Sequence, residues 1–377
     1  MEWVTLGYSK KAVNRAGQSL PKLGFLLPEE YNSCLEVVNN WRACHNYPLN
    51  TFQVSLRRRA RNLDRTALVA QRIKRLPSII RKLEIFPKMT LSQMQDLGGC
   101  RAVLRNIAHV RKLTTNYQAG FSTHQLTRCD DYIATPRDTG YRGVHLVFRY
   151  QAEGIGSAYN GLQIEMQLRS QMQHIWATAV ETVDTFTRQA LKSSIGQPDW
   201  LRFFALMSSA IAIAERSALV PNTPQEGSAL IAELRAISKK LDVKRRFAAF
   251  PTVIKIIGEH AKSSDHFFLL ELDPDKGELD VRSFKKNQAE EASESYLDAE
   301  KHIDPASPQQ IVLVSVNSVA ALRRAYPNYF LDSRNFIDLL DSALSGRPMR
   351  APPMPRSPKS QRAEDMPPLL KLMMDES

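Results

Sequence analysis

The segment Leu162–Arg169, LQIEMQLR, alternates strictly between apolar and polar residues. A period of two is the pattern of a β-strand whose two faces meet different surroundings. Its leucines, isoleucine and methionine would fill a core, whereas Glu165, Gln167 and Arg169 would share the opposite face. A carboxylate, an amide and a guanidinium in one row are unusual on a half-buried strand unless that face lines a site. The segment therefore predicts a sheet with one apolar face and one functional face.

The surrounding patterns predict helices on both sides of this sheet. Apolar residues at helical spacing indicate helices from residue 29 to about 76, and again over 171–186, 198–217 and 226–246. Short apolar runs bounded by turn residues predict two further strands, over 98–106 and 141–150. We therefore expect an α+β protein in which a mixed central sheet is flanked by helices.

The composition changes near Phe250, where a small C-terminal α/β module is expected to begin. Two apolar runs around Asp-Pro-Asp-Lys-Gly predict a hairpin, and an acidic helix and another strand follow it. The segment after Gly346 is rich in proline and basic residues, and we expect it to be disordered. The resulting boundaries are a large N-terminal domain over 1–222, a connecting helix over 223–249, the small module over 250–345 and a tail over 346–377.

Charge and cysteine content limit the class of function. The chain has 51 Lys and Arg residues against 39 Asp and Glu, a net charge of +12, with a basic concentration between Ser55 and Lys82. Such an excess favours an anionic partner, either a nucleotide or RNA. The four cysteines form no CxxC pair and no zinc-ligand spacing, and no apolar run is long enough to cross a bilayer. We therefore expect a reduced, cytoplasmic protein without a structural metal.

Carboxylates at two places suggest a magnesium site. Asp96 stands just before the Gly98-Gly99 pair, where backbone or phosphate can approach closely, and Arg101 follows on the strand. Asp96 and Glu165 on neighbouring strands would provide what a Mg²⁺ ion bridging triphosphate oxygens requires.

The segment RDTGYRGVH is a second candidate for ligand binding. Its two glycines predict a flexible loop, Tyr141 offers a stacking face, and cationic or donor groups come from Arg137, Arg142 and His145. An ordinary hairpin turn would account for this segment equally well.

Together these segments resemble the RelA/SpoT-like nucleotidyltransferase family, the alarmone synthetases. The resemblance covers about Arg72 to Glu181 and rests on four motifs in the family's order: RIKRLPSIIRK, DLGGCR, DYIATPRDTGYRGVH and IEMQLRSQMQHIWATAVE. It implies that Asp96 and Glu165 hold Mg²⁺ on ATP and that Tyr141 stacks on the acceptor base. It implies that the ATP phosphates are bound by Arg72, Lys74 and Lys82, which we place on a basic helix. It also implies that the pocket is completed by Arg101 and Gln167, and that the acceptor is bound by Arg137, Arg142 and His145.

The reaction that the resemblance implies is transfer of pyrophosphate from ATP to a ribose 3'-hydroxyl, with release of AMP. Housekeeping members of the family use GDP or GTP as acceptor, and a toxic branch uses the 3'-CCA end of tRNA. The family usually has Lys at the position of Arg137 and Ser at the position of Gly143, so the sequence leaves the choice of acceptor open. No His-Asp pair of a hydrolase domain precedes Asp96, so we do not expect alarmone hydrolysis.

The C-terminal module resembles the antitoxin half of CapRel-type fused toxin-antitoxin proteins. In that family, the antitoxin half derives from a zinc-finger domain that has lost its metal ligands. The absence of cysteine after Cys129 agrees with this. The family's YxxY element matches Tyr326 and Tyr329, and the resemblance implies that it blocks the adenine end of the ATP site. It further implies release by a phage protein such as the major capsid protein, as part of abortive infection.

Three functions follow from these patterns. The first is an autoinhibited toxin that transfers pyrophosphate from ATP to tRNA. The second is an alarmone synthetase that uses GDP or GTP and carries a regulatory C-terminal module. The third is an inactive nucleotide or RNA sensor, against which the joint presence of Asp96, Tyr141, Glu165 and Gln167 argues. In the second and third cases, Tyr326 and Tyr329 would belong to the core of a small domain.

Overall fold

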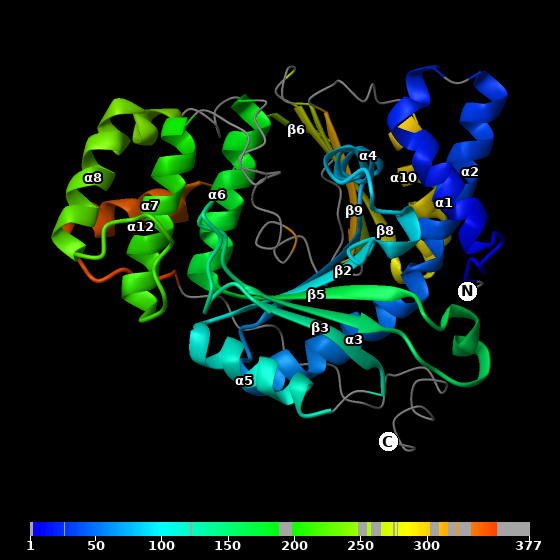
Figure 1. Cartoon of the computed structure of the whole chain (residues 1–377), viewed down its shortest axis with the longest axis horizontal. Coiled ribbons are helices and arrows are strands. Elements are labelled where there is room, and N and C mark those ends of the chain that lie inside the picture. The colour runs from blue at the N-terminus through cyan, green and yellow to red at the C-terminus, as the bar shows by residue number, and fades with distance from the viewer. Residues whose placement is uncertain are drawn as a thin grey trace.

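The strands of the protein form one mixed sheet with helices on both sides (Figure 1). The computed structural model describes residues 3–25, 27–120, 123–187, 198–247, 255–257, 265–273, 276, 278–301, 309–315, 322 and 333–352. Nine strands of this part lie in the order β3-β4-β5-β2-β1-β9-β7-β8-β6. Their bounds are β1 (Leu68–Ile73), β2 (Gly98–Leu104), β3 (Gln125–Asp131), β4 (Val144–Arg149), β5 (Gln163–Ser170), β6 (Lys255–Ile257), β7 (Asp265–Asp273), β8 (Glu278–Lys285) and β9 (Gln310–Ser315). The expected α+β class with a mixed, helix-flanked sheet is confirmed.

The α-helices occupy the N-terminal part, the connections between strands and the end of the described chain. Their bounds are α1 (Lys10–Ser19), α2 (Pro28–Cys44), α3 (Asn46–Leu63), α4 (Leu76–Ile85), α5 (Ile107–Gln118), α6 (Gln171–Thr187), α7 (Pro198–Glu215), α8 (Gly227–Lys240), α10 (Ala289–Lys301) and α12 (Arg334–Ser345). None of the helices in the described ranges has the length and apolar character that crossing a bilayer requires.

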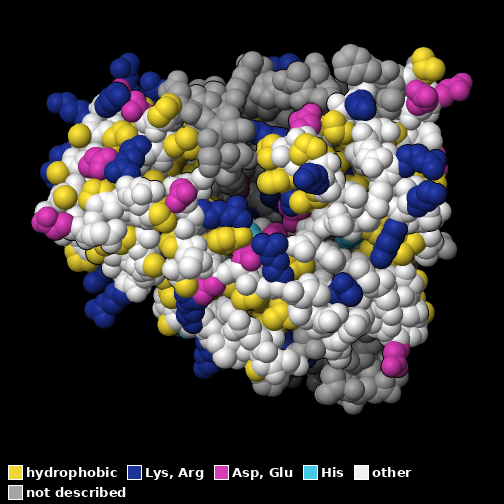
Figure 2. All heavy atoms as spheres, in the orientation of Figure 1, with side chains coloured by type: hydrophobic (Ala, Val, Ile, Leu, Met, Phe, Trp, Pro, Cys, Tyr) yellow, Lys and Arg dark blue, Asp and Glu magenta, His cyan; other side chains and the backbone are white. Residues whose placement is uncertain are grey.

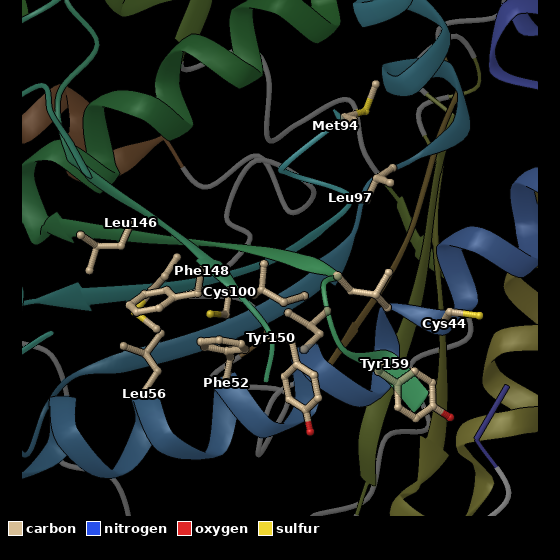
Figure 3. Close-up of a cluster of buried hydrophobic side chains, with 14 of the residues drawn as sticks. Cys44, Phe52, Leu56, Met94, Leu97, Cys100, Leu146, Phe148, Tyr150 and Tyr159 are labelled. Atoms are coloured by element: carbon tan, nitrogen blue, oxygen red, sulfur yellow. The ribbon is translucent and has the colours of Figure 1, made fainter. Parts of the chain in front are cut away.

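The main core lies between α3 and the apolar face of the central strands. β5 pairs in parallel with β2 and antiparallel with β4, so the apolar residues of the three strands share one face. Phe52 and Leu56 of α3 pack against this face, where Cys100, Leu146 and Phe148 are fully buried (Figure 3). The predicted alternation of β5 is confirmed, and its polar residues are left on the face away from α3.

The sequence patterns missed three of the described strands, namely β1, β3 and the three-residue strand β6. Residues 29–76 were expected to be helical throughout, but residues 68–73 form β1, which pairs with β2 and β9. The arginines on both sides of this short apolar run masked it, and pairing with two neighbours favours the strand over the helix. β3 was also missed, because its sequence QLTRCDD has no apolar alternation. An edge strand that is largely exposed does not need one.

The strands of the expected C-terminal module continue the same sheet. β9 pairs antiparallel with β1 on one side and with β7 on the other. On the sheet face opposite α3, Leu68, Ala70 and Val103 form one buried cluster with apolar residues of β7, β8 and β9. The boundary at residue 250 remains a prediction, because these strands share both hydrogen bonds and core with the central sheet.

A second core lies among α6, α7, α8 and α12. Trp200 and Phe204 stack with ring centroids 5.7 Å apart, and Phe336 of α12 packs on Phe204 at 5.9 Å. Met349 and Ala351 are packed against this cluster, within the segment expected to be a disordered tail. The structure therefore describes the chain as far as residue 352, and residues 353–377 lie outside the described part.

Replacement of Phe268 tests the continuity of the sheet. Phe268 of β7 is fully buried in the cluster with Leu68 and Ala70. We expect Phe268→Ala to lower the free energy of unfolding by about 3 kcal/mol or more, because it leaves a cavity. Hydrogen exchange should accelerate at the amides of β1 as well as those of β7. The matched variant Phe336→Ala, in the second core, should affect α7 and α12 more than β1. Unchanged exchange in β1 of Phe268→Ala would contradict a shared core.

Candidate active site

The candidate site lies on the face of the sheet opposite α3. Where β5 pairs with β2, Glu165 is opposite Gly99 and Gln167 is opposite Arg101. Where β5 pairs with β4, Gln167 is opposite His145. Paired residues of neighbouring strands point to the same face. The polar residues predicted from three separate segments are therefore brought together. Figure 2 shows a recess near the middle of this side of the molecule, with basic and acidic side chains around it.

Five side chains form a closed ring of hydrogen bonds at one end of the site. Tyr141 Oη and His145 Nε2 are hydrogen-bonded, and His145 Nδ1 lies 2.8 Å from Glu165 Oε1. Gln167 Nε2 donates to Glu165 Oε2 at 2.7 Å. Arg169 Nη2 closes the ring by donating to Gln167 Oε1 at 3.0 Å and to Tyr141 Oη at 2.9 Å. Such a ring fixes the position of each member, because moving one breaks bonds to two others.

The ring carries unusual protonation states. Burial alone would lower the pKa of His145, but Tyr141 and the Glu165 carboxylate raise it to about 9. Burial alone would raise the pKa of Tyr141, but Arg169 and His145 bring it down to about 8. Burial also disfavours ionised Glu165, yet its hydrogen bond and charge contact with His145 hold its pKa below the usual value. At neutral pH the His145 imidazolium therefore donates from Nδ1 to Glu165 and from Nε2 to Tyr141.

Asp96 is held between two lysines. Lys74 Nζ lies 2.9 Å from Asp96 Oδ2, and Lys82 Nζ lies 2.8 Å from Asp96 Oδ1. Burial disfavours the ionised form of Asp96, but the two lysines outweigh it and hold the pKa of Asp96 well below its usual range. Lys74 follows β1 directly and Lys82 lies on α4, so the basic residues 72 and 74 do not lie on the helix expected for them. Three chain segments thus meet at one carboxylate.

Asp96 and Glu165 form a donor set suited to Mg²⁺. They lie close enough for the charge of Asp96 to oppose ionisation of Glu165, and both side chains are partly exposed. Within the described ranges, no group of three or more His, Cys, Asp or Glu side chains is arranged to hold a metal. Mg²⁺ commonly uses one or two protein carboxylates and takes its other ligands from phosphates and water. The residues present fit such an ion together with a polyphosphate.

Arg72 and Arg101 lie on the same face of the sheet as this carboxylate pair. Arg72 is opposite Gly99 in the β1–β2 register, and its charge lowers the pKa of Lys74, although burial is the larger cause. Arg101 is opposite Gln167 on β5 and is partly exposed. Both arginines therefore lie on the face that carries the carboxylates, and their contact with ATP phosphates remains a prediction.

Arg137 and Arg142, which were both expected at the acceptor, have different surroundings. Arg137 is exposed, donates from Nη2 to Tyr132 Oη at 2.6 Å, and lies 4.4 Å over the Tyr132 ring. Arg142 is buried, and its guanidinium donates to Ser208, Ser217 and the carbonyl of Ala218 beside α7. The structure therefore does not bring Arg142 to the site, because its hydrogen bonds attach the loop to α7.

Gly140 strengthens this attachment. Its φ of +90° lies in the left-handed region, and a Cβ there would come within 2.9 Å of Trp176. Its carbonyl accepts a hydrogen bond from Ser208 at 2.6 Å. The loop that carries Tyr141 is therefore held in one conformation against α6 and α7.

Two residues of the site were missed by the sequence analysis. Arg169 was placed on the polar face of its strand but was given no role, although it closes the ring on Tyr141. Tyr132 packs edge-to-face on Tyr141 and on His145, with centroids 5.8 and 5.2 Å apart. The alternation of β5 was a signal for Arg169, whereas nothing in the sequence singled out Tyr132. Tyr326 and Tyr329 lie outside the described residues, so their expected role remains a prediction.

The part of the chain that contains this site is similar to known proteins. Residues 71–185 match the family model described as a region found in RelA and SpoT proteins. The GTP pyrophosphokinase YjbM of Bacillus subtilis is 29% identical over 114 residues, which are 29% of this chain and 52% of that protein. The GTP pyrophosphokinase YwaC of the same species is 26% identical over 112 residues, 28% of this chain and 52% of that protein. The chain thus spans about half the length of these relatives.

Two solved structures are similar over part of the chain. The small alarmone synthetase 1 of B. subtilis bound to its product pppGpp has a TM-score of 0.40 and 21% identity, covering 47% of this chain and 91% of that one. A GTP pyrophosphokinase family protein from Streptococcus pneumoniae has a TM-score of 0.37 and 17% identity, covering 45% and 85%. The family match includes Arg72, Asp96, Tyr141 and Glu165. Residues 71–185 of this chain are therefore similar to a region found in RelA and SpoT proteins.

Proposed function

We propose that the protein is a pyrophosphokinase, which transfers the β- and γ-phosphoryl groups of ATP together to the 3'-hydroxyl of a ribose. The observation that carries this proposal is the pairing of Asp96 with Lys74 and Lys82 beside Glu165. Two lysines, two arginines and two carboxylates on one face match the charge of a triphosphate with its metal ion. The relatives named GTP pyrophosphokinases support the same reaction class.

The chemistry divides between two ends of the site. The acceptor hydroxyl would lose its proton to solvent as its oxygen bonds to the β-phosphorus of ATP. The bond between that phosphorus and the α-phosphate oxygen would break, and AMP would leave. Asp96 and Glu165 would hold Mg²⁺, which when bound neutralises charge on the phosphate oxygens. Lys74, Lys82 and Arg72 would hold the triphosphate in line, and most of the rate would come from positioning and charge neutralisation.

Tyr141 would form the acceptor end. His145 and Arg169 both donate to its hydroxyl oxygen, so its ring is fixed before a ligand arrives. A fixed ring gives a base a stacking surface with little loss of entropy. Tyr132, with Arg137 over its ring, would form the neighbouring wall.

We propose a guanosine di- or triphosphate as the first candidate acceptor, because both curated relatives are named for GTP. The tRNA 3' end is the second candidate, favoured by the net charge of +12. Part of that charge does not bear on the site. The arginines of α3 are on the helix that packs against the opposite face of the sheet, so the basic run from Ser55 to Lys82 is not one surface.

Autoinhibition by Tyr326 and Tyr329, with release by a phage protein, is the finer proposal for the C-terminal region. A flat phenol ring suits an adenine pocket because both are π-systems. Release would require a ligand that binds the open state more tightly than the closed one.

Label transfer from γ-³²P-ATP tests the reaction and its acceptor. Intact protein and the variant Tyr326→Ala/Tyr329→Ala are each given GDP and, separately, bulk tRNA. We expect label on GDP in both proteins if the acceptor is a guanosine nucleotide. Label on tRNA, appearing only in the double variant, would support the tRNA acceptor and the inhibitory tyrosines together. Transfer to neither acceptor by either protein would contradict the proposed function.

Replacement of Asp96 tests the metal and phosphate end. We expect Asp96→Asn to reduce transfer at least about a hundredfold, because a preorganised charge at the transferred group is lost. ATP affinity without Mg²⁺ should not fall, since Lys74 and Lys82 are then freed for phosphate. Glu153→Gln, which neutralises an exposed carboxylate outside the site, serves as the control and should leave transfer unchanged. Near-normal transfer by Asp96→Asn would refute this role.

NMR titration of His145 tests the charge state of the ring. We expect its imidazole resonances to titrate at about 9. In Glu165→Gln the pKa should fall toward the ordinary value of about 6.5, because a neutral amide stabilises the imidazolium less than a carboxylate does. Because the folded pKa is raised, the stabilisation from this contact is present at neutral pH and is lost as pH rises through 9. A wild-type titration near 6.5 would contradict the proposed ring.

A further inference from the structure

A buried ion pair joins α2 to α10, behind the lysine end of the site. Arg42 Nη1 lies 2.7 Å from Glu300 Oε2, and Arg42 Nη2 lies 3.2 Å from Glu300 Oε1. Tyr296, one turn earlier on α10, accepts from Arg42 at 2.7 Å and donates to Glu300 at 2.8 Å. All three side chains are less than 10% exposed. Residues separated by more than 250 positions in the chain are therefore fixed to each other.

The same pair holds the backbone of the segment that carries Lys74. Arg42 Nε and Nη2 donate to the Lys74 carbonyl at 3.2 and 3.0 Å. Glu300 Oε1 accepts from the Leu76 amide at 2.7 Å. One residue between them, Arg75, donates to Gln310 Oε1 of β9 at 3.1 Å. Three consecutive residues are thus held: Lys74 by Arg42 of α2, and Arg75 and Leu76 by residues beyond 285.

These contacts act on the two lysines that meet at Asp96. Lys74 is fixed on one side by its amide, which donates to the Leu97 carbonyl at 2.8 Å, and on the other side by Arg42. Leu76 is the first residue of α4, the helix that carries Lys82. Its amide is one of those that a helix leaves without an internal partner, and Arg75 at the N-cap makes no side-chain cap bond. Glu300 supplies that cap from another element, with a negative charge that suits a helix N-terminus.

Breaking the pair would leave a buried charge without its partner. The Arg42 guanidinium has acceptors at every nitrogen, and Glu300 provides two of them. Removal of one member of a buried ion pair is strongly unfavourable, because the other cannot be solvated in place. We expect the chain around the pair to rearrange so that water can enter, and both members of the pair contact the segment 74–76. Displacement of this segment changes the position of Lys74 and the direction of α4.

We propose that Glu300 and Arg42 are positioning residues for the donor nucleotide, which hold Lys74 and Lys82 where they bind the ATP phosphates. This inference rests on the proposed function for the identity of the nucleotide. The region beyond residue 285 is then a structural part of the ATP site. Removal of all residues after 249 would not yield an active enzyme freed from inhibition. It would also remove Glu300 and β9, the strand that pairs with β1.

Binding of the non-hydrolysable analogue α,β-methylene-ATP to the full chain, measured by calorimetry, tests the proposal. We expect Glu300→Ala to weaken binding at least tenfold, while the KM for the acceptor changes less than threefold. Glu300→Gln keeps an acceptor for the Leu76 amide but loses the charge. Its affinity for the analogue should lie between those of the wild type and Glu300→Ala. Hydrogen exchange at the amides of 74–82 should accelerate in Glu300→Ala and much less in Glu300→Gln.

Two control variants separate positioning from loss of stability. Glu294→Ala removes an exposed carboxylate from the same helix and should leave analogue binding unchanged. Leu339→Ala creates a cavity in the second core and lowers stability without touching residues 74–76. At a temperature where every variant is folded, only the Glu300 variants should lose affinity.

The outcomes are distinguishable from failure of the proposed function. Unchanged analogue affinity in Glu300→Ala, or a loss equal to that in Leu339→Ala, would overturn the positioning role while leaving the pyrophosphokinase proposal in place. Absence of analogue binding by both the wild-type chain and Tyr326→Ala/Tyr329→Ala, in which the proposed inhibition is removed, would overturn both. If Glu300→Ala does not fold, affinity and hydrogen exchange of Glu300→Gln decide the question: wild-type values in both would refute the proposal.

Discussion

The two-faced strand β5 is the constraint on which the rest of the structure depends. Its isoleucine, methionine and leucine bury one face against α3, and this burial fixes the register of β4 and β2 beside it. A shift of one residue would expose the apolar set to the site and bury Glu165, Gln167 and Arg169 without partners. The hydrophobic core therefore determines which side chains line the site.

Electrostatics on the polar face depend on burial as much as on charge. Asp96 and Glu165 stay ionised only because lysines and an imidazolium compensate for their desolvation. The cations in turn are crowded: burial first, then the charges of Lys82 and Arg72, lower the pKa of Lys74 despite its contact with Asp96. A phosphate chain would relieve this repulsion, whereas an apolar ligand would not. This crowding of cations supports the proposal that the site binds a polyanion.

The C-terminal strands and α10 contact elements of the site from outside the family match. The match ends at residue 185, but β9 pairs directly with β1, and α10 caps the helix that carries Lys82. A region joined in this way can influence nucleotide binding through the segment 74–76 without entering the pocket. The same contacts would then serve both regulation and nucleotide binding. Point substitutions can distinguish these two roles, whereas truncation would affect both at once.

The sequence by itself determined the polar face of β5, the carboxylates, the loop tyrosine and the strands of the C-terminal hairpin. These features are local, because alternation and turn residues depend on near neighbours along the chain. Only the tertiary structure decided that residues 68–73 pair as a strand, that Arg142 binds α7 rather than a ligand, and that the hairpin extends the central sheet. It also brought Glu300 to the Leu76 amide. Each of these depends on a partner far away in the chain, and the identity of that partner is set by packing and by the need to pair buried polar groups.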